Sequence, residues 1–515
     1  MTEAGKRPVA AAIIGLTLVA FLLRFWGLTR QSLWADEAFT VIWAGIFEGY
    51  TAEKFFLNLQ GPVHAVALYL WTCLFGTGEA ALRSFGAVLG TATIPCFYWA
   101  LRPVLRREAA LLACLLLAVS PFHLWYSQEV RNYVLLILTG IVSIGAYLRI
   151  LQGQRGWVLY TVANVLGLLS NLSYVFLLGA QALGLVGFGR GRRTLLARIA
   201  LSWTATVLVL TPWFIQFYDR KVVPSGLAGH PATTDLTQVR GATTVPILGL
   251  PYAYYVFATG YSFGPSLAEL HETAGAGLTA SVRGHLPALL WAAAVFGMVG
   301  LMGARKLWRE GGPQRFWLLL LVFPVALTYL VALLNLKVFN ARYAAVAFPA
   351  VLVVLTMGVL ASPRAWVRWS LLAAILISFG VSIAGYEFDP RYWKEDARSA
   401  TAFLRTEARS GDLLLSVGSD IPLGAYYWPA GGGVPPGLEQ WNIVSWQEEG
   451  LGIGEQFDRF EELVRGHRRV FVLFLRPTDT DRDGLWTEHL GRRHGIERTV
   501  TYPGVTIHVI AGGAP

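Results

Sequence analysis

Charged residues are scarce in this chain: Asp, Glu, Lys and Arg make up 14% of its 515 residues, whereas hydrophobic residues make up 55%. The mean hydropathy is +0.50. A soluble globular chain normally carries about 25% charged residues, so this composition excludes an ordinary soluble protein and indicates a polytopic membrane protein. Cysteine is scarce as well. Cys73, Cys96 and Cys114 lie in or beside apolar segments without metal or redox spacing, and we expect them to be small packing residues.

Apolar segments of membrane-spanning length follow one another along residues 1–385. The segment 61–75 is short and contains Pro62 and His64, so we expect an interfacial helix there. The sequence predicts eleven spans, of which the sixth is short, at 8–28, 82–101, 109–122, 131–150, 156–173, 174–189, 195–216, 286–304, 316–335, 343–361 and 366–385.

The positions of the basic residues support this set of spans. Under it, short loops that include Arg106, Arg149, Arg309 and Arg364 all face one side, as the positive-inside rule requires. Counting 61–75 as a span would reverse every later loop. The N-terminus is therefore predicted to be cytoplasmic, and the first segment is read as a span because no small-residue cleavage site follows it.

The last quarter of the chain differs in composition from the rest. Residues 386–515 hold 14 basic and 19 acidic residues, against 28 and 13 in residues 1–385. Helix-like and strand-like stretches alternate in it, which predicts a small α/β domain outside the cytoplasm. The expected fold is thus a mainly α, polytopic bundle followed by this domain. The excess of basic residues lies in the short loops on one side of the membrane, and no cluster of basic and aromatic residues lies on a soluble face. Nucleic acid is therefore not expected as a partner.

Two outward segments, 29–81 and 217–285, are too long to be turns, and loops of that size tend to be functional. The first carries adjacent carboxylates, Asp36 and Glu37, just beyond the first span. Carboxylates are costly beside hydrocarbon, so at this position they usually face a wet cavity and hold a cation, a proton or a polar substrate. The alternative is that they solvate a loop or cap the next helix.

The second outward segment is rich in tyrosine and also contains Ser266, Glu269 and His271. Aromatic faces mixed with a few polar groups suit an interfacial lid over a lipid or a sugar. Anchoring at the headgroups explains any single tyrosine equally well.

Two further polar segments are predicted to face the same side as Asp36. Carboxylates together with Arg and Lys at one side of a helical bundle can activate a hydroxyl group while holding an anionic leaving group. Alternatively, a carboxylate and an arginine two residues apart neutralise each other at an interface. The residues concerned are Glu129, Arg131 and Tyr133 after the third span, and Lys337, Arg342 and Tyr343 between the ninth and tenth.

In these segments the chain resembles the GT-C superfamily of polyprenyl-phosphate-sugar glycosyltransferases, close to the protein O-mannosyltransferase and aminoarabinose transferase branch. The Asp-Glu loop in its aromatic setting, followed at this spacing by the Ser-Pro to Glu-x-Arg block, is the specific part. The resemblance covers Arg24 to the Asp36–Glu37 loop, Gly61–Pro62, residues 78–83, Ser120–Pro121 to Glu129–Tyr133, and Arg342–Tyr343.

The resemblance implies a role for several residues. Asp36 would be the general base on the acceptor hydroxyl, with Glu37 positioning substrate or supporting the base. Arg342 and Arg131 would hold the lipid phosphate of an undecaprenyl-type donor. Glu129 would orient an arginine or help to bind a metal or a sugar. The remaining candidates are Lys337 and Tyr343 at the phosphate, and Tyr133, His64, Ser266, Glu269 and His271 around the substrate.

The chain departs from the family pattern at two places. It reads Ser170-Asn171-Leu172 where relatives often carry a His, and Gln60-Gly61-Pro62 where relatives often have His-Pro-Pro. The second difference bears on the choice of a lipid, glycan or protein acceptor. Some relatives bind a divalent cation and others do not, and no ligand spacing here requires one, so a divalent cation stays open and no other cofactor is assigned.

Three functions fit these observations. The first is a glycosyltransferase, hexosyl or pentosyl, in a bacterial plasma membrane, because arginine far outnumbers lysine as in high-GC bacteria. The second is a transporter or flippase of a lipid-linked sugar, which should show charged or helix-breaking residues near the middle of paired spans and a repeated half. The third is a ligase-like or scaffold protein with a glycan-binding tail. Polar clusters at one membrane face favour the enzyme.

Overall fold

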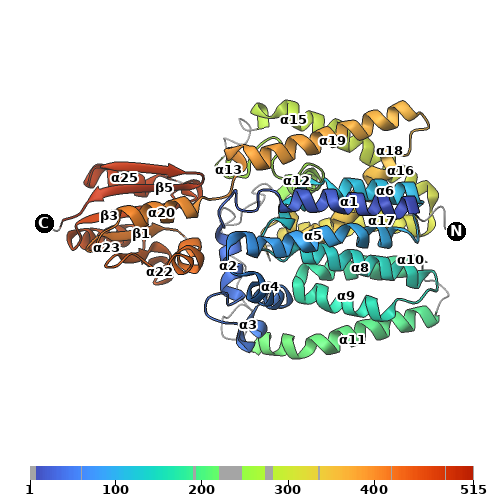
Figure 1. The fold of residues 1–515 in the computed structure, drawn as a ribbon, viewed down its shortest axis with the longest axis horizontal. Coiled ribbons are helices and arrows are strands. Elements are labelled where there is room, and N and C mark those ends of the chain that lie inside the picture. Colours follow the sequence, from blue (N-terminus) through green and yellow to red (C-terminus); the bar gives the residue numbers. More distant parts are fainter. Residues whose placement is uncertain are drawn as a thin grey trace.

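The structure is a computed structural model that describes residues 7–58, 61–188, 193–219, 246–272, 282–334, 337–418, 420–481 and 483–513. It consists of a helical bundle with a small sheet-containing domain at one end (Figure 1). The first helix begins at the end of the bundle far from this domain and runs towards it (Figure 1). The mainly α fold with a small C-terminal sheet is as the sequence predicts.

Eight helices in the described ranges are long and apolar enough to cross a membrane. α8 and the η7–α18 pair are buried on nearly all sides and form the centre of the bundle. The helices are α1 (Arg7–Phe25), α5 (Glu79–Leu101), α8 (Tyr133–Leu151), α11 (Arg193–Phe217), α15–η5–α16 (Leu286–Ala292, Ala293–Gly297, Met298–Glu310), α17 (Arg315–Leu333), η7–α18 (Ala341–Ala347, Phe348–Val359) and α19 (Ala365–Phe388).

The other predicted spans correspond to shorter or broken helices. α6 (Arg107–Ala118) and α7 (Pro121–Ser127) form one bent pair with a 56° break, and counting it as a span gives nine. The break lies where Ser120 caps α7 and Pro121 occupies its first turn. α9 (Trp157–Ser170) and α10 (Val175–Phe188) have 14 residues each, as does α4 (Pro62–Phe75), which covers the expected interfacial segment. The count of eleven spans therefore stays a prediction.

Large apolar side chains point outwards from the bundle. Ile14 on α1 is 69% exposed and Leu301 on α16 is 75% exposed. Exposed apolar faces of this size on several long helices fit contact with lipid tails rather than with water.

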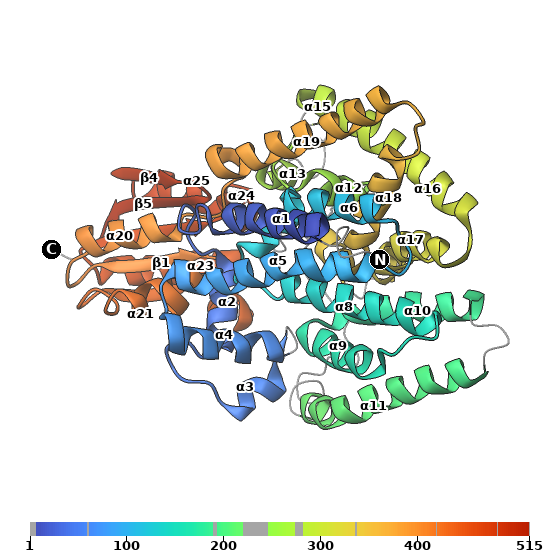
Figure 2. The ribbon, with the colours of Figure 1, turned by 45° about the vertical axis from the view of Figure 1, so that its right-hand side comes forward.

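The loops between α5 and α6, α8 and α9, α16 and α17, and α18 and α19 lie at the end of the bundle far from the small domain (Figure 2). Arg149 donates to the carbonyl of Trp99 at 2.6 Å and lies over its ring. Lys306, on α16, donates to the carbonyl of Leu360 at the end of α18 at 2.8 Å. The clustering agrees with the grouping of these loops that the charge pattern predicts.

The C-terminal domain is built on a five-stranded mixed sheet of order β2-β1-β3-β5-β4. β1 runs parallel to β2 and β3, whereas β5 is antiparallel to β3 and β4. A tight turn at Gly504, where φ is +62°, joins β4 to β5. The strands are β1 (Leu413–Val417), β2 (Glu439–Asn442), β3 (Arg469–Leu475), β4 (Arg498–Tyr502) and β5 (Val505–Ala511).

The two faces of the sheet have different partners. One face, with Phe471 and Ile507, shares a hydrophobic core with α20 and with Leu33 and Leu82 of the bundle. The other face is covered by α22, α23 and α25 through residues such as Trp446. These helices are α20 (Ala397–Glu407), α22 (Ile443–Glu448), α23 (Ile453–Arg465) and α25 (Leu485–Arg493).

The predicted outward segments contain short helices at the end of the bundle that carries the C-terminal domain (Figure 1). Residues 220–245 and 273–281 of the second segment lie outside the described residues. The remaining short helices are α2 (Ala35–Trp43), α3 (Ala52–Leu57), η2 (Leu172–Tyr174), α12 (Pro246–Thr259), α13 (Leu267–Glu272), η6 (Gly312–Gln314), η8 (Pro390–Tyr392), η9 (Leu423–Tyr427), α21 (Trp428–Ala430) and α24 (Pro477–Thr480).

Candidate active site

Asp36 lies in the first turn of α2 and pairs with arginines from two distant segments. Its Oδ2 atom is 2.7 Å from the guanidinium of Arg342, on η7, and 3.9 Å from that of Arg131, which precedes α8. Arg131 also donates to the backbone carbonyl of Asp36 at 2.9 Å. Asp36, Arg131 and Arg342 are called the Asp36 cluster below. The structure thus brings together the three segments that the sequence places on one side.

Within the Asp36 cluster the acid is the most accessible member. The Asp36 side chain is 29% exposed, against 8% and 9% for the two arginines. Burial raises the pKa of Asp36, but the guanidinium groups of Arg342 and Arg131 outweigh it and lower the pKa to about 2. The cluster carries two positive charges and one negative charge, so it has a surplus of one positive charge for an anion that enters beside Asp36.

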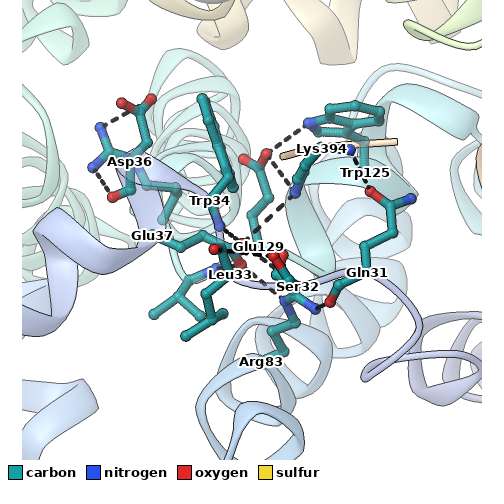
Figure 3. Close-up of polar contacts among 12 residues, drawn as sticks. Gln31, Ser32, Leu33, Trp34, Asp36, Glu37, Arg83, Trp125, Glu129 and Lys394 are labelled. Atoms are coloured by element: carbon teal, nitrogen blue, oxygen red, sulfur yellow. Dashed lines mark hydrogen bonds and ion pairs between the residues drawn. The ribbon is translucent and has the colours of Figure 1, made fainter. Parts of the chain in front are cut away.

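Glu37, although adjacent in sequence, faces the protein interior (Figure 3). Arg83 binds both carboxylate oxygens, at 2.9 and 2.7 Å, and the Val130 N–H donates to Oε1 at 2.9 Å. The side chain is 0% exposed. Burial raises its pKa, but Arg83 and the ammonium of Lys394 lower it below the ordinary value. Glu37 is thus a fixed, charged anchor of the loop, which fits support of the base rather than contact with substrate.

Lys394, which follows η8, inserts between the buried carboxylates (Figure 3). Its ammonium lies 2.9 Å from Glu129 and 4.0 Å from Glu37, and its side chain is 1% exposed. The indole N–H of Trp125 donates to the same oxygen of Glu129 at 2.8 Å. Glu37, Arg83, Glu129 and Lys394 are called the Glu37 cluster below. This cluster fixes the chain that enters the C-terminal domain to the end of the bundle.

Aromatic rings surround the arginines of the Asp36 cluster. Tyr133 is nearly buried, with the guanidiniums of Arg131 and Arg342 5.9 and 5.6 Å from its ring centre. Lys337 is exposed and its ammonium lies 4.5 Å from the ring centre of Tyr343. Cations over ring faces are stabilised by the ring quadrupole, so these rings hold the basic groups in place at this end of the bundle.

His64 lies beside the Asp36 cluster on α4, buried at 2% exposure against the ring of Phe85. With Thr40, Gly61 and Arg131 it lines a small cavity. Gly61 has φ +121°, and a Cβ there would lie 2.4 Å from the Ser170 carbonyl oxygen. This backbone and the close Ser170 carbonyl favour glycine at position 61.

Ser266 and Glu269 pair with each other at the start of α13. The Ser266 N–H donates to Glu269 at 2.7 Å, and the Glu269 N–H donates to the Ser266 hydroxyl at 3.2 Å. His285 lies 3.3 Å from Glu269. Burial raises the pKa of Glu269, but the Ser266 N–H and His285 lower it below the ordinary value. This is the geometry of a helix cap; the side chain of His271 lies outside the described residues.

The carboxylates of the Asp36 cluster and the Glu37 cluster all have cationic partners. Asp36 is paired with arginine, Glu37 with arginine and lysine, and Glu129 with lysine. Among the residues that the structure describes, three metal-ligand side chains converge elsewhere, in the C-terminal domain.

Sequence reasoning missed Lys394 and gave Arg83 no role of its own. Arg83 lies in a segment that carries the family resemblance, and its position one turn into an apolar helix is the signal of a buried, paired charge. Lys394 lies among charged residues at the start of the tail, where a lysine is ordinarily solvated, and nothing in the local pattern marks it.

The comparisons with known proteins cover both parts of the chain. Residues 60–215 match the family model of dolichyl-phosphate-mannose-protein mannosyltransferases. A search of curated protein sequences gave no match. Apo ArnT from Cupriavidus metallidurans superposes with a TM-score of 0.60 at 15% identity, covering 98% of both chains. The chain has the GT-C fold.

Two further solved structures support this fold assignment. ArnT from the same organism bound to undecaprenyl phosphate gives a TM-score of 0.56 at 16% identity over 97% of both chains. The oligosaccharyltransferase AglB from Archaeoglobus fulgidus, in complex with an inhibitory peptide and a dolichol-phosphate, gives 0.54 at 13% identity over 98% of this chain and 74% of that chain. Because ArnT matches over nearly the whole length, the bundle and the C-terminal domain both have counterparts in it. The resemblance expected from the motifs is thus confirmed in the fold.

Proposed function

We propose that this protein is a membrane glycosyltransferase that moves a hexose or a pentose from a polyprenyl phosphate to a hydroxyl of a lipid, glycan or protein. The observation that carries the proposal is the Asp36 cluster: a partly exposed carboxylate, 2.7 Å from one arginine and near a second, at the end of a membrane bundle. A base, a phosphate clamp and a membrane surface must meet in such an enzyme, because the donor keeps its tail in the bilayer.

The charge of the Asp36 cluster fits the charge of the donor. A sugar linked to polyprenyl phosphate is a phosphodiester with one negative charge, and its binding beside Asp36 balances the two arginines. The phosphate then shares Arg342 and Arg131 with the carboxylate, which weakens their effect on Asp36 and raises its pKa from about 2 towards the ordinary value. Donor binding therefore turns a weak base into a stronger one.

The chemical step follows from these positions. The acceptor oxygen attacks the anomeric carbon while its proton moves to Asp36, the new carbon–oxygen bond forms, and the bond from the anomeric carbon to the phosphate oxygen breaks. The bonding electron pair leaves on the phosphate as its second negative charge. Since Asp36 loses one negative charge as the phosphate gains one, the arginines face a constant total charge. A single displacement inverts the anomeric configuration.

A large apolar cavity supports a role for an isoprenoid chain. It measures about 800 Å³ and is lined by residues of α12, α15, η5, α16 and α18, such as Tyr252, Phe296, Leu301 and Val354. α12 contacts both α7 and η7, the element that carries Arg342. A lipid tail in this cavity would therefore lie next to the helices that position the phosphate clamp.

The remaining parts of the proposal concern location. The protein would lie in a bacterial plasma membrane, with the N-terminus cytoplasmic and residues 386–515 outside. Residues 1–385 would form the catalytic domain. Four buried polar groups inside the bundle, Ser143, Asn164, Gln181 and Tyr160, are neutral and hydrogen-bonded to one another, as expected of an enzyme rather than of a transporter with charged midspan groups.

The test compares lipid, glycan and protein extracts from the native host with and without the gene. Mass spectrometry is expected to reveal a product that is one hexose or pentose lighter without the gene. Wild-type protein and Asp389→Asn should restore the sugar, whereas Asp36→Asn should not. Asp389 is a matched control because it too is 29% exposed and pairs with an arginine at 2.7 Å. Restoration by Asp36→Asn would refute the assigned base, and unchanged extracts would refute the function.

A further inference from the structure

Three side chains converge on the outer layer of the C-terminal domain, away from the site described above. Glu461 comes from α23, His489 from α25, and His494 from the residue that ends α25. The Nε2 atoms of His489 and His494 lie 2.8 and 3.0 Å from the same oxygen, Oε1 of Glu461. The side chains are 25%, 14% and 13% exposed in the order Glu461, His489, His494. They are sheltered by the protein yet accessible from solvent.

Aromatic rings fix the orientation of both imidazoles. His489 stacks flat on Phe457, with ring centres 4.1 Å apart and an angle of 4° between the planes. His494 meets the ring of Phe460 edge-on at 5.7 Å. Both phenylalanines belong to α23, as does Glu461. The two nitrogens are therefore aimed at the carboxylate before any ligand arrives, which lowers the cost of ordering them.

The distances nearly match those around a bound metal ion. Zinc binds histidine nitrogen and carboxylate oxygen at about 2.0–2.2 Å, so neighbouring ligand atoms in a tetrahedral site are about 3.3 Å apart. The two nitrogen–oxygen distances here are 2.8 and 3.0 Å, and all three ligand atoms lie within 4.8 Å of one another. The two nitrogen–oxygen distances would have to lengthen by only a few tenths of an ångström for these atoms to share one ion.

We propose that Glu461, His489 and His494 bind a divalent transition-metal ion of the zinc type. Two imidazoles with one carboxylate suit zinc and disfavour calcium and magnesium, which prefer oxygen ligands alone. Three protein ligands leave the fourth position of a tetrahedral ion to water or to a further ligand. The ion would join α23 to the end of α25 on the sheet face opposite the bundle. The proposal is independent of the glycosyltransferase function.

Two other histidines provide a comparison within the same chain. His467 lies 3.0 Å from Glu439, and His285 lies 3.3 Å from Glu269. Each of these pairs brings together one imidazole and one carboxylate, so each offers two ligands. His467→Gln is therefore a matched control that removes a histidine–glutamate contact of the same domain without touching the three-ligand group.

The experiment uses the full-length protein, free of any affinity tag, in detergent micelles after treatment with a chelator. Titration with zinc chloride, followed by calorimetry, is expected to give about one ion per chain and a raised unfolding temperature. The His489→Gln/His494→Gln double variant and Glu461→Gln should bind roughly 100-fold more weakly or not at all. His467→Gln should bind like wild type. Absence of zinc binding to wild type at about 100 µM, or equal binding by the double variant, would overturn the proposal.

Cobalt gives a readout that does not depend on the folding of any variant. Wild-type protein loaded with Co²⁺ should show the intense visible absorption of a tetrahedral or five-coordinate ion, and zinc should displace it. A weak, octahedral spectrum like that of cobalt in water would contradict the proposed ligands.

Discussion

The Asp36 cluster and the Glu37 cluster lie side by side at the end of the bundle, yet they differ in what surrounds each carboxylate. Glu37 is fully buried and its two oxygens receive bonds from Arg83 and from the Val130 N–H. Asp36 is 29% exposed and its closest side-chain partner is Arg342. One acid is fixed by the protein, and the other is held by a cation that a phosphate could also bind.

Helix geometry produces this difference from two adjacent residues. Asp36 and Glu37 occupy the first turn of α2, where successive side chains point about 100° apart. One is therefore partly exposed and the other lies in the core. The comparison teaches that the buried acid and its partners fix the loop, whereas the partly exposed acid is the one that we propose as the base.

The largest expected effect is on the transfer rate, when the partly exposed acid Asp36 is replaced. Asp36→Asn keeps the shape but removes the base, so the transfer rate should fall by about 10²–10⁴-fold. The variant should also bind undecaprenyl phosphate at least as tightly as wild type, since the carboxylate no longer competes for Arg342. Rates from purified protein and binding from native mass spectrometry test both parts. A variant with full turnover would contradict the role of Asp36.

Glu37→Gln should instead damage the fold. It leaves the charge of Arg83 buried without an anion, which costs about 3–5 kcal/mol. The unfolding temperature in detergent should fall sharply, and the yield of folded protein with it. Glu48→Gln is the control, because Glu48 is 77% exposed beside Lys54 and such surface pairs are worth about 0–1 kcal/mol. Equal stability of the two variants would remove Glu37 from its anchoring role.

Lys394→Met tests whether the Glu37 cluster holds the C-terminal domain to the bundle. Glu129 would lose its cation while 1% exposed, so we expect a loss of roughly 2–4 kcal/mol. Adding Glu129→Gln should recover part of that loss, because it removes the unpaired charge. A double-mutant cycle on unfolding temperatures measures the recovery. Strictly additive effects would show that the two groups do not interact.

The smallest expected effect is on the pH dependence of folding stability. Asp36 has a pKa of about 2 in the folded protein and an ordinary value of 3.8. A lowered pKa stabilises the fold above about pH 4, and this contribution of about 2 kcal/mol is lost as the pH falls towards 2. The stability difference between wild type and Asp36→Asn, measured by denaturant unfolding from pH 6 to pH 3, should therefore shrink. A difference that stays constant would mean that Asp36 is not paired as described.

Much of this arrangement could be predicted from the sequence. Hydropathy and the positive-inside pattern place the segments of Asp36, Arg131 and Arg342 on one side before any contact is known. The sequence does not reveal which acid is buried, because that depends on Arg83 and Val130 in distant segments. The sequence predicts Ser266 and Glu269 as polar groups of a substrate lid. In the structure they form a capping box at the start of α13, and their three-residue spacing fits that role too.

The C-terminal domain was predicted less completely. The buried strands β1, β3 and β5 have apolar runs that identify them, whereas the edge strands β2 and β4 are short and only partly buried and contain no apolar run. His489 and His494 join Glu461, 28 and 33 residues earlier, only because α23 and α25 pack together on the sheet. No short motif encodes that contact.

The most direct test of the account is a structure of the protein bound to undecaprenyl phosphate. We predict that a phosphate oxygen lies within hydrogen-bonding distance of the Arg342 guanidinium, with the Asp36 carboxylate turned towards the space beside it. A phosphate bound elsewhere, with Asp36 and Arg342 still 2.7 Å apart as in the present structure, would contradict the account.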